Sequence, residues 1–473
     1  MFPELPDRSL AELGRTEGGA GTLALLARDQ DTRRLLLLRA VLDAAEAAGR
    51  QICSDARRRR LQQDWALLAE AERTDRARGV ASSARARLTQ PLTGPWAGGC
   101  LRGLRRAATT DAERRDLARD LAHFSTLAAV AAARAGISFS TRLTARDGLL
   151  ALPSLGALRT DADETTVEAV HDKGVMILRR SGARDVLVHL ERDAGAWSAS
   201  PAWTSAYALP GLLAGARPMP LEDLDPYRVP PRESGQYALS GPAAPDDAER
   251  KRWLQAWSAV APVLQTGGQH RLTETLALLR CLVPLRTPPG SDGRDSCSAT
   301  RREAFGALLS SVPATPVAFA ATLVHELQHC KLVALSEMVT LHQADRTARH
   351  FAPWRPDPRP YGGLLQGTYA HLGLADFFQR RALTQERDRQ RSASAWVQHA
   401  RYRAQVGATL PALVGSPHLT VRGRAFVDEM VATYERMADH PAPRGHTARA
   451  QAYVKAARVL WTQRHPSASP TNR

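Results

Sequence analysis

Two histidines and a glutamate are the strongest candidates for chemistry in the sequence, in the order His325-Glu326-Leu327-Gln328-His329. Residues four apart lie on the same face of an α-helix, one turn above the other. The imidazoles of His325 and His329 can therefore bind one divalent ion at about 2.1 Å each. Glu326 is rotated by about 100° from His325, so its carboxylate can contact a metal-bound water or a substrate. We predict His325 and His329 as metal ligands and Glu326 as the catalytic carboxylate.

The residues around this motif predict a long and mostly buried helix. Apolar side chains recur along it at helical spacing, namely Val317, Phe319, Ala320, Leu323, Val324, Leu327, Leu332 and Leu335. Pro316 suits the first position of such a helix. Histidines and a glutamate on a buried apolar helix are costly without a partner, and a metal ion is one. The alternative is a polar cluster at a partly wet helix edge, which the apolar context makes the weaker interpretation.

The motif helix itself offers no suitable third metal ligand. In the extended pattern H-E-x-x-H-x-x-G-x-x-H, Leu332 and Leu335 stand at the glycine and final histidine positions. Glu337 lies two helical turns beyond His329, so it cannot fold back to the same ion. Glu337 is at best a residue that orients a ligand. The third ligand must therefore lie on another element.

A second helix is predicted from near Gly362 through Phe378, after a proline-rich segment. This helix can pack antiparallel to the motif helix and present His371 inward among leucines. We favour His371 as the third metal ligand, with His350 as the runner-up. An ordinary core histidine at position 371 remains an open alternative.

Composition limits the classes of partner. The net charge of +16 comes almost wholly from arginines, which alternate with Asp and Glu along predicted helices such as residues 113–120 and 380–391. Such alternation is typical of a solvated face, so no nucleic-acid partner is predicted.

Five cysteines are scattered singly, without the spacing of a disulfide framework or a zinc knuckle. No apolar run approaches the roughly 20 residues that span a membrane, and the first residues lack a signal-peptide pattern. We expect a cytoplasmic protein without a membrane partner.

The first half of the chain divides into two predicted regions. Residues 1–136 are helical, with helices over Ser54–Ala77 and Asp111–Ala133. Residues 137–245 begin with strands and end in a connector rich in proline and glycine from Ala199. The strands are Ile137–Thr141, Val175–Leu178 and Val186–Leu190, with a hairpin turn at Asp172-Lys173-Gly174.

Residues 246–473 contain the motif and are predicted to form the metal-binding catalytic domain. A strand over Ala304–Val312 precedes the motif helix and could offer its edge to an extended peptide. The predicted fold class is α+β and mainly helical. It combines an N-terminal helical bundle and a small β region with a C-terminal, zincin-like helical metal domain.

Three long segments resemble one known family, the "HEXXH motif domain" proteins. They are HELQHCKLVALSEMVTLH, APWRPDPRPYGGLLQGTYAHLGLADFF and SPHLTVRGRAFV. LLARDQDTRRLLLLRAVLDAA and ALPGLLAGARPMPLEDLDPYR also resemble it, so the likeness spans nearly the whole chain. Members accompany radical-SAM peptide maturases in bacterial ribosomal-peptide gene clusters, and include iron(II)- and 2-oxoglutarate-dependent peptide β-hydroxylases. The resemblance implies such a hydroxylase acting on a precursor peptide, with His325 and His329 as iron ligands and His371 as our proposed third.

The resemblance leaves three functions open. A 2-oxoglutarate oxygenase needs a cation for the distal carboxylate of its cosubstrate, and an arginine grips a carboxylate with two parallel hydrogen bonds. Arg355 and Arg359, in the proline-rich segment, are the candidates, although both also fit ordinary surface arginines. A zinc metallopeptidase that processes the same peptide would use Glu326 as the general base. A non-catalytic peptide-binding partner of a radical-SAM maturase is the third alternative.

Overall fold

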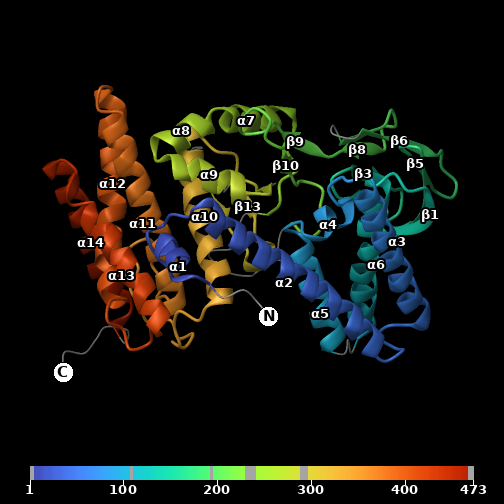
Figure 1. Cartoon of the computed structure of the whole chain (residues 1–473), viewed down its shortest axis with the longest axis horizontal. Helices are drawn as coiled ribbons and strands as arrows, with labels where there is room; N and C mark the ends of the chain where they lie inside the picture. The colour runs from blue at the N-terminus through green and yellow to red at the C-terminus, as the bar shows by residue number, and fades with distance from the viewer. Residues whose placement is uncertain (1–4, 107–109, 192–194, 229–240, 288–296, 467–473) are drawn as a thin grey trace.

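The structure is a computed structural model that describes residues 5–106, 110–191, 195–228, 241–287 and 297–466 (Figure 1). It is mainly helical with small sheets, which confirms the predicted mainly helical α+β class. The helices are α1 (Asp7–Gly14), α2 (Ala20–Ala47), α3 (Asp55–Ala77), α4 (Ser83–Leu88), α5 (Thr93–Arg105), α6 (Asp111–Arg134), α7 (Asp247–Ser258), α8 (Val260–Thr266), α9 (Gln269–Leu278), α10 (Pro316–Met338), α11 (Tyr361–Thr384), α12 (Arg389–Thr409), α13 (Val421–Arg436) and α14 (Arg444–Arg464), with 3₁₀ turns η1 (Arg302–Ala304) and η2 (Leu410–Ala412). No described helix is both long enough and apolar enough to cross a membrane.

Side-chain caps fix the starts of the helices that the sequence predicted most clearly. Ser54 accepts a hydrogen bond from the Arg57 amide at the start of α3. Thr110 and Glu113 form a reciprocal capping box at the start of α6. Thr315 caps α10, and Pro316 occupies its first turn. These helices confirm the predictions over residues 54–77 and 111–133 and the predicted motif helix.

An antiparallel sheet packs beside α6. Its strands lie in the order β1-β4-β5-β6-β7, so β1 is at one edge. Lys173 (φ 47°) and Gly174 (φ 82°) make the predicted tight turn between β4 and β5. A second sheet has the order β2-β3-β8. The strands are β1 (Phe139–Thr144), β2 (Leu149–Leu152), β3 (Gly156–Arg159), β4 (Thr166–Asp172), β5 (Val175–Arg179), β6 (Val186–Glu191), β7 (Gly195–Trp197) and β8 (Trp203–Ser205).

A third sheet lies next to α10 and has the order β12-β13-β11-β10-β9. Its strands are β9 (Tyr207–Leu209), β10 (Met219–Leu221), β11 (Cys281–Pro284), β12 (Ser298–Ala299) and β13 (Ala307–Ser310). The predicted strand over Ala304–Val312 is therefore β13. The prediction that it offers a free edge is wrong, because β11 and β12 pair with its two sides.

The predicted connector over Ala199–Pro245 is only partly irregular, because it contains β8, β9 and β10. Short strands of three residues carry little periodicity, which is why the proline and glycine content hid them. Residues 229–240 of the connector lie outside the described part of the chain.

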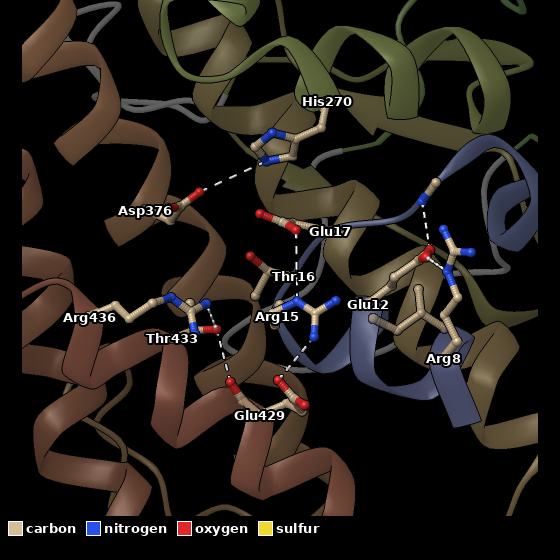
Figure 2. A network of polar contacts seen from close by, with 12 residues as sticks. Arg8, Glu12, Arg15, Thr16, Glu17, His270, Asp376, Glu429, Thr433 and Arg436 are labelled. Carbon is tan, nitrogen blue, oxygen red and sulfur yellow. Dashed lines mark hydrogen bonds and ion pairs between the residues drawn. The ribbon is translucent and has the colours of Figure 1, made fainter. Parts of the chain in front are cut away.

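Helix α1, near the N-terminus, packs against helices of the C-terminal half of the chain. Leu10 and Leu13 of α1 belong to the same buried cluster as Leu327 of α10 and Phe426 of α13. Figure 2 shows the polar contacts of this region, where Arg15 lies between Glu17 and Glu429. Helix α2 then leads from this core toward α3 and α6 (Figure 1).

A buried charge network ties the N-terminal turn to the elements beside the motif. The side chains of Arg271 on α9 and Lys331 on α10 are 0% exposed. Arg271 pairs with Glu274 at 3.2 Å and Asp376 at 3.0 Å, and Lys331 pairs with Glu274 at 2.7 Å. The Lys331 ammonium also donates to the Thr16 carbonyl at 2.9 Å. This network holds α9, α10 and α11 in a fixed relation, which in turn positions the motif face of α10.

Candidate metal centre

Helices α10 and α11 pack antiparallel and bring three histidines together. His325 of α10 meets His371 of α11, with ring centroids 5.3 Å apart. One turn later on α10, the His329 ring is within hydrogen-bond distance of Gln366, which precedes His371 in α11. The numbering thus runs in opposite directions along the two helices, as predicted. His371 is 7% exposed and faces the motif.

The two motif imidazoles converge at their Nε2 atoms. These atoms are 3.1 Å apart, and the ring centroids are 4.7 Å apart. Metal–nitrogen bonds of about 2.1 Å place two ligand nitrogens about 3.0 Å apart at a right angle and about 3.4 Å apart at a tetrahedral angle. The observed separation falls between these values. His325 and His329 therefore fit two adjacent positions on one metal ion.

Two of the three imidazoles are oriented through their Nδ1 atoms. Nδ1 of His329 lies 3.1 Å from Oε1 of Gln366, and Nδ1 of His371 lies 2.7 Å from the Gly367 carbonyl oxygen. A proton on each Nδ1 completes these hydrogen bonds and leaves the lone pair on Nε2, which is the arrangement of a metal-binding histidine. The Nδ1 atom of His325 is buried without a hydrogen-bond partner in the described structure.

Burial favours the neutral form of His325 and His371, which is the form that binds metals. Burial lowers the pKa of His371 to about 4, against a raising effect of its bond to Gly367. Burial also lowers the pKa of His325 well below its ordinary value, and the neighbouring histidines add to this effect. Neutral imidazole is the ligand form, so His325 and His371 can bind a metal at neutral pH.

The His371 ring lies somewhat farther from His325 than His329 does, with ring centroids 5.3 Å apart instead of 4.7 Å. Among the described residues, no group of three or more His, Cys, Asp or Glu side chains is arranged to hold a metal ion as it stands.

Glu326 points away from the shared face, toward strand β12. Its Oε1 accepts a hydrogen bond from the Ser298 hydroxyl at 2.8 Å, and its Oε2 has no partner in the described structure. The residue is 3% exposed. Burial raises its pKa, and nearby His329 and the Ser298 bond oppose this rise. Glu326 is thus a buried carboxyl group beside the histidines that can hold a proton more readily than an exposed glutamate.

Trp354 forms one wall of the centre, although sequence reasoning missed it. Its ring stacks on the His371 ring at 4.2 Å with an interplanar angle of 16°. Gly367 of α11 makes room for it, because a Cβ at that position would lie 2.9 Å from Trp354 Cε2 and closer still to Cζ2. A glycine four residues before His371 is the sequence signal that this helix face is closely covered.

A cavity of about 1080 Å³ opens at His325 and His371. Helices α8, α10, α11, α12 and α14 contribute to its wall, and Trp354 and Tyr402 lie beside His371. Three arginines line it, Arg381, Arg391 and Arg401, whereas its described lining contains no Asp or Glu. Arg401 on α12 adds to the lowering of the His371 pKa, so its charge acts at the centre itself. We name this space the histidine cavity.

The two arginines predicted to bind a cosubstrate lie elsewhere. Nε of Arg355 lies 2.9 Å from Asp357, and Nη1 of Arg359 lies 3.6 Å from the same carboxylate. Neither belongs to the lining of the histidine cavity. The proline-rich segment instead contributes Trp354 to the centre. The position of Arg401 was not predicted, because α12 carries no motif that relates it to His371.

The remaining ligand candidates are not part of the centre. His350 lies against Tyr361, with ring centroids 5.8 Å apart. Glu337 accepts hydrogen bonds from Gln30 at 2.9 Å and Arg302 at 2.9 Å, so it joins α10 to the N-terminal half. As predicted, it does not fold back toward His329.

Comparisons with known proteins do not assign the chain. No model of a known protein family matches it, and no curated protein matches it.

Proposed function

We propose that the chain is an iron(II)- and 2-oxoglutarate-dependent hydroxylase that acts on the β-carbon of a side chain in a ribosomally synthesised precursor peptide. The observation that carries the proposal is the histidine cavity, where the imidazoles of His325 and His371 and the guanidinium of Arg401 line one space. The resemblance of the motif segments to the HEXXH motif domain family supports the choice of reaction.

The donor set fits an iron(II) ion. His325, His329 and His371 would hold it through their Nε2 atoms, since imidazole nitrogen suits iron as well as zinc. When bound, iron with 2-oxoglutarate and O₂ supplies the oxidising chemistry that places an oxygen atom on a C–H bond. Gln366 and Gly367 hold the Nδ1 atoms of His329 and His371, so Nε2 is the nitrogen left for the metal in these two rings.

Arg401 is the best-placed residue to bind the distal carboxylate of 2-oxoglutarate. It lines the cavity with His371, and no described carboxylate lies within 4.0 Å of its guanidinium. Of the other two lining arginines, Arg391 pairs with Asp388 at 3.1 Å and Arg381 donates to Thr266 at 2.7 Å. An arginine without a carboxylate partner can grip an incoming carboxylate with both its nitrogens.

The size and walls of the cavity suit a second, larger ligand beside the cosubstrate. Ligand sites commonly measure about 300–1,000 Å³, so 1080 Å³ exceeds the need of a small dicarboxylate. Leu374, Phe378 and Tyr402 form an apolar and aromatic wall that excludes water from the side chain of a bound peptide. The peptide side chain would enter past Trp354, next to the metal ligands.

A zinc metallopeptidase acting on the same peptide is the second candidate, because Glu326 follows His325 directly. A general base must reach a metal-bound water in the open part of the site. Glu326 is instead held by Ser298 and is not among the residues that line the histidine cavity. This arrangement favours the hydroxylase. A non-catalytic partner of a radical-SAM maturase would need neither the three histidines nor Arg401 beside the same cavity.

One experiment separates the three functions. The purified chain is loaded with iron(II) and 2-oxoglutarate without oxygen, mixed with candidate precursor peptides, and then exposed to O₂. A peptide heavier by one oxygen atom, together with succinate, is expected for the hydroxylase. A cleaved backbone with zinc alone identifies the peptidase, and peptide binding without either product identifies the non-catalytic partner.

A further inference from the structure

A second hollow lies in the N-terminal half, between α3, α6 and the end of the β1–β4 pair. Its volume is about 490 Å³. The first turns of α3 and the first half of α6 form its sides, and Arg142 and Thr144 of β1 form its end. In Figure 1, α3, α6 and β1 lie together at the right of the molecule, on the opposite side from α11–α14. The hollow is therefore separate from the histidine cavity.

Five arginines line this hollow, and Glu164 is its sole described carboxylate. The arginines are Arg57 and Arg60 from α3, Arg115 and Arg119 from α6, and Arg142 from β1. We name this feature the arginine groove. Such an excess of one charge in a concave surface raises the local concentration of ligands of the opposite charge.

Three of these arginines are available to a ligand. Arg60 pairs with Asp64 at 3.1 Å, and Arg119 pairs with Glu164. By contrast, Arg57, Arg115 and Arg142 have no carboxylate oxygen within 4.0 Å in the part of the chain that the structure describes. The available cations come from three different elements, so they surround the groove rather than line one helix face.

The floor of the groove is apolar. Leu61 of α3 and Ala118, Leu121 and Ala122 of α6 lie between the arginines. An aliphatic side chain can pack against this floor while carboxylates on either side reach the guanidinium groups. The groove therefore combines contacts for negative charge with contacts for small apolar groups.

We propose that the arginine groove binds an acidic, aliphatic segment of a polypeptide. β1 is the edge strand of its sheet, although its Arg142 carbonyl already accepts a hydrogen bond from Arg60 at 3.0 Å, so a peptide would be held mainly through its side chains. The lining described for the groove contains no Phe, Tyr or Trp, and single-stranded nucleic acid is usually held by stacking on such rings. A peptide is therefore the better match than a nucleic acid. The inference does not depend on the metal centre.

The test measures binding of labelled probes to the full chain at low salt, by fluorescence polarisation. The probe is a repeating Glu-Leu-Glu-Ala peptide, and a repeating Gln-Leu-Gln-Ala peptide and a thymidine oligonucleotide serve for comparison. Two triple variants lose the same charge, Arg57→Gln/Arg115→Gln/Arg142→Gln in the groove and Arg59→Gln/Arg105→Gln/Arg106→Gln at exposed positions outside it. Thermal unfolding of both variants verifies that they fold.

The wild type is expected to bind the acidic peptide, and the groove variant about tenfold more weakly, since exposed ion pairs each contribute modestly. The variant outside the groove is expected to bind within about twofold of the wild type. Equal weakening in both variants overturns the proposal, because it reveals attraction by net charge alone. Tighter binding of the oligonucleotide than of the acidic peptide, or equal binding of the neutral peptide, overturns it as well. Restoring arginine at position 142 in the groove variant should recover part of the affinity.

Discussion

Gly367→Ala tests whether Trp354 positions His371 for metal binding. Alanine replaces glycine favourably in most helix interiors, by up to about 1 kcal/mol. At Gly367 the added Cβ would lie 2.9 Å from Cε2 and 3.0 Å from Nε1 of Trp354, so the indole ring must move. That ring stacks on His371 at 4.2 Å, and the Gly367 carbonyl holds the Nδ1 atom of the same histidine. The substitution therefore displaces the ring that stacks on the predicted third ligand and retains the carbonyl that bonds its Nδ1 atom.

The expected magnitudes follow from these contacts. Forcing an extra carbon into a packed interface costs about 1–3 kcal/mol, so the helix gain is cancelled or exceeded. Loss of the groups that orient a ligand weakens metal binding about 10- to 100-fold. Gly99→Ala is the matched control, because Gly99 also lies inside a helix, α5, and a Cβ there meets nothing within 4 Å.

The assay is competition for a divalent metal between the protein and a coloured chelator, with urea unfolding measured in parallel. Gly367→Ala should lose at least about tenfold in metal affinity without gaining stability. Gly99→Ala should keep its metal affinity and gain up to about 1 kcal/mol of stability. If Gly367→Ala binds metal as tightly as Gly99→Ala and is equally stabilised, the role assigned to Trp354 is refuted.

Three further predictions concern other parts of the structure. Arg401→Gln should weaken anaerobic binding of 2-oxoglutarate to the iron-loaded protein about tenfold or more, whereas Arg355→Gln should leave this binding unchanged. The reverse result would indicate that the proline-rich segment binds the cosubstrate. Arg271→Met leaves buried carboxylates without their main cation and should cost about 3–5 kcal/mol in urea unfolding, compared with little change for the exposed Arg252→Met. Burial lowers the pKa of His399 to about 4, so the unfolded chain binds more protons than the folded chain between about pH 4 and 6.5. The free energy of unfolding should therefore fall as the pH is lowered over that range, by at most about 3 kcal/mol from this residue. A His399→Gln variant should show a flatter dependence of this free energy on pH.

Local sequence signals predicted the elements that carry the centre. The spacing of His325 and His329, the Thr315 cap and Pro316 are all features of one helix, so they could be read without knowledge of the fold. His371 was predicted from the apolar pattern of a second helix. The structure brings the two rings together because the two apolar helices, connected by residues 339–360, pack antiparallel.

Features that depend on contacts between distant segments could not be predicted. Arg401 reaches the histidine cavity because α12 packs along α11, which no spacing in the sequence reveals. The edge of β13 is covered by β12, a strand of two residues that is too short for any periodic signal. The N-terminal turn at Thr16 contacts Arg271 and Lys331 across more than two hundred residues, and buried ion pairs leave no periodic pattern in the sequence. The domain limits drawn at residues 136 and 245 and the zincin-like character of the C-terminal region remain predictions.

Metal content is the most direct test of the central claim that His325 and His329 bind one ion. The protein is loaded with iron(II) without oxygen, freed of excess metal and analysed by mass spectrometry of the elements, with His350→Ala as the control outside the centre. The wild type and His350→Ala should retain about one metal ion per chain, and His325→Ala and His329→Ala should lose it while still folded. Wild-type protein without stoichiometric metal, or His325→Ala protein that keeps it, would contradict the account.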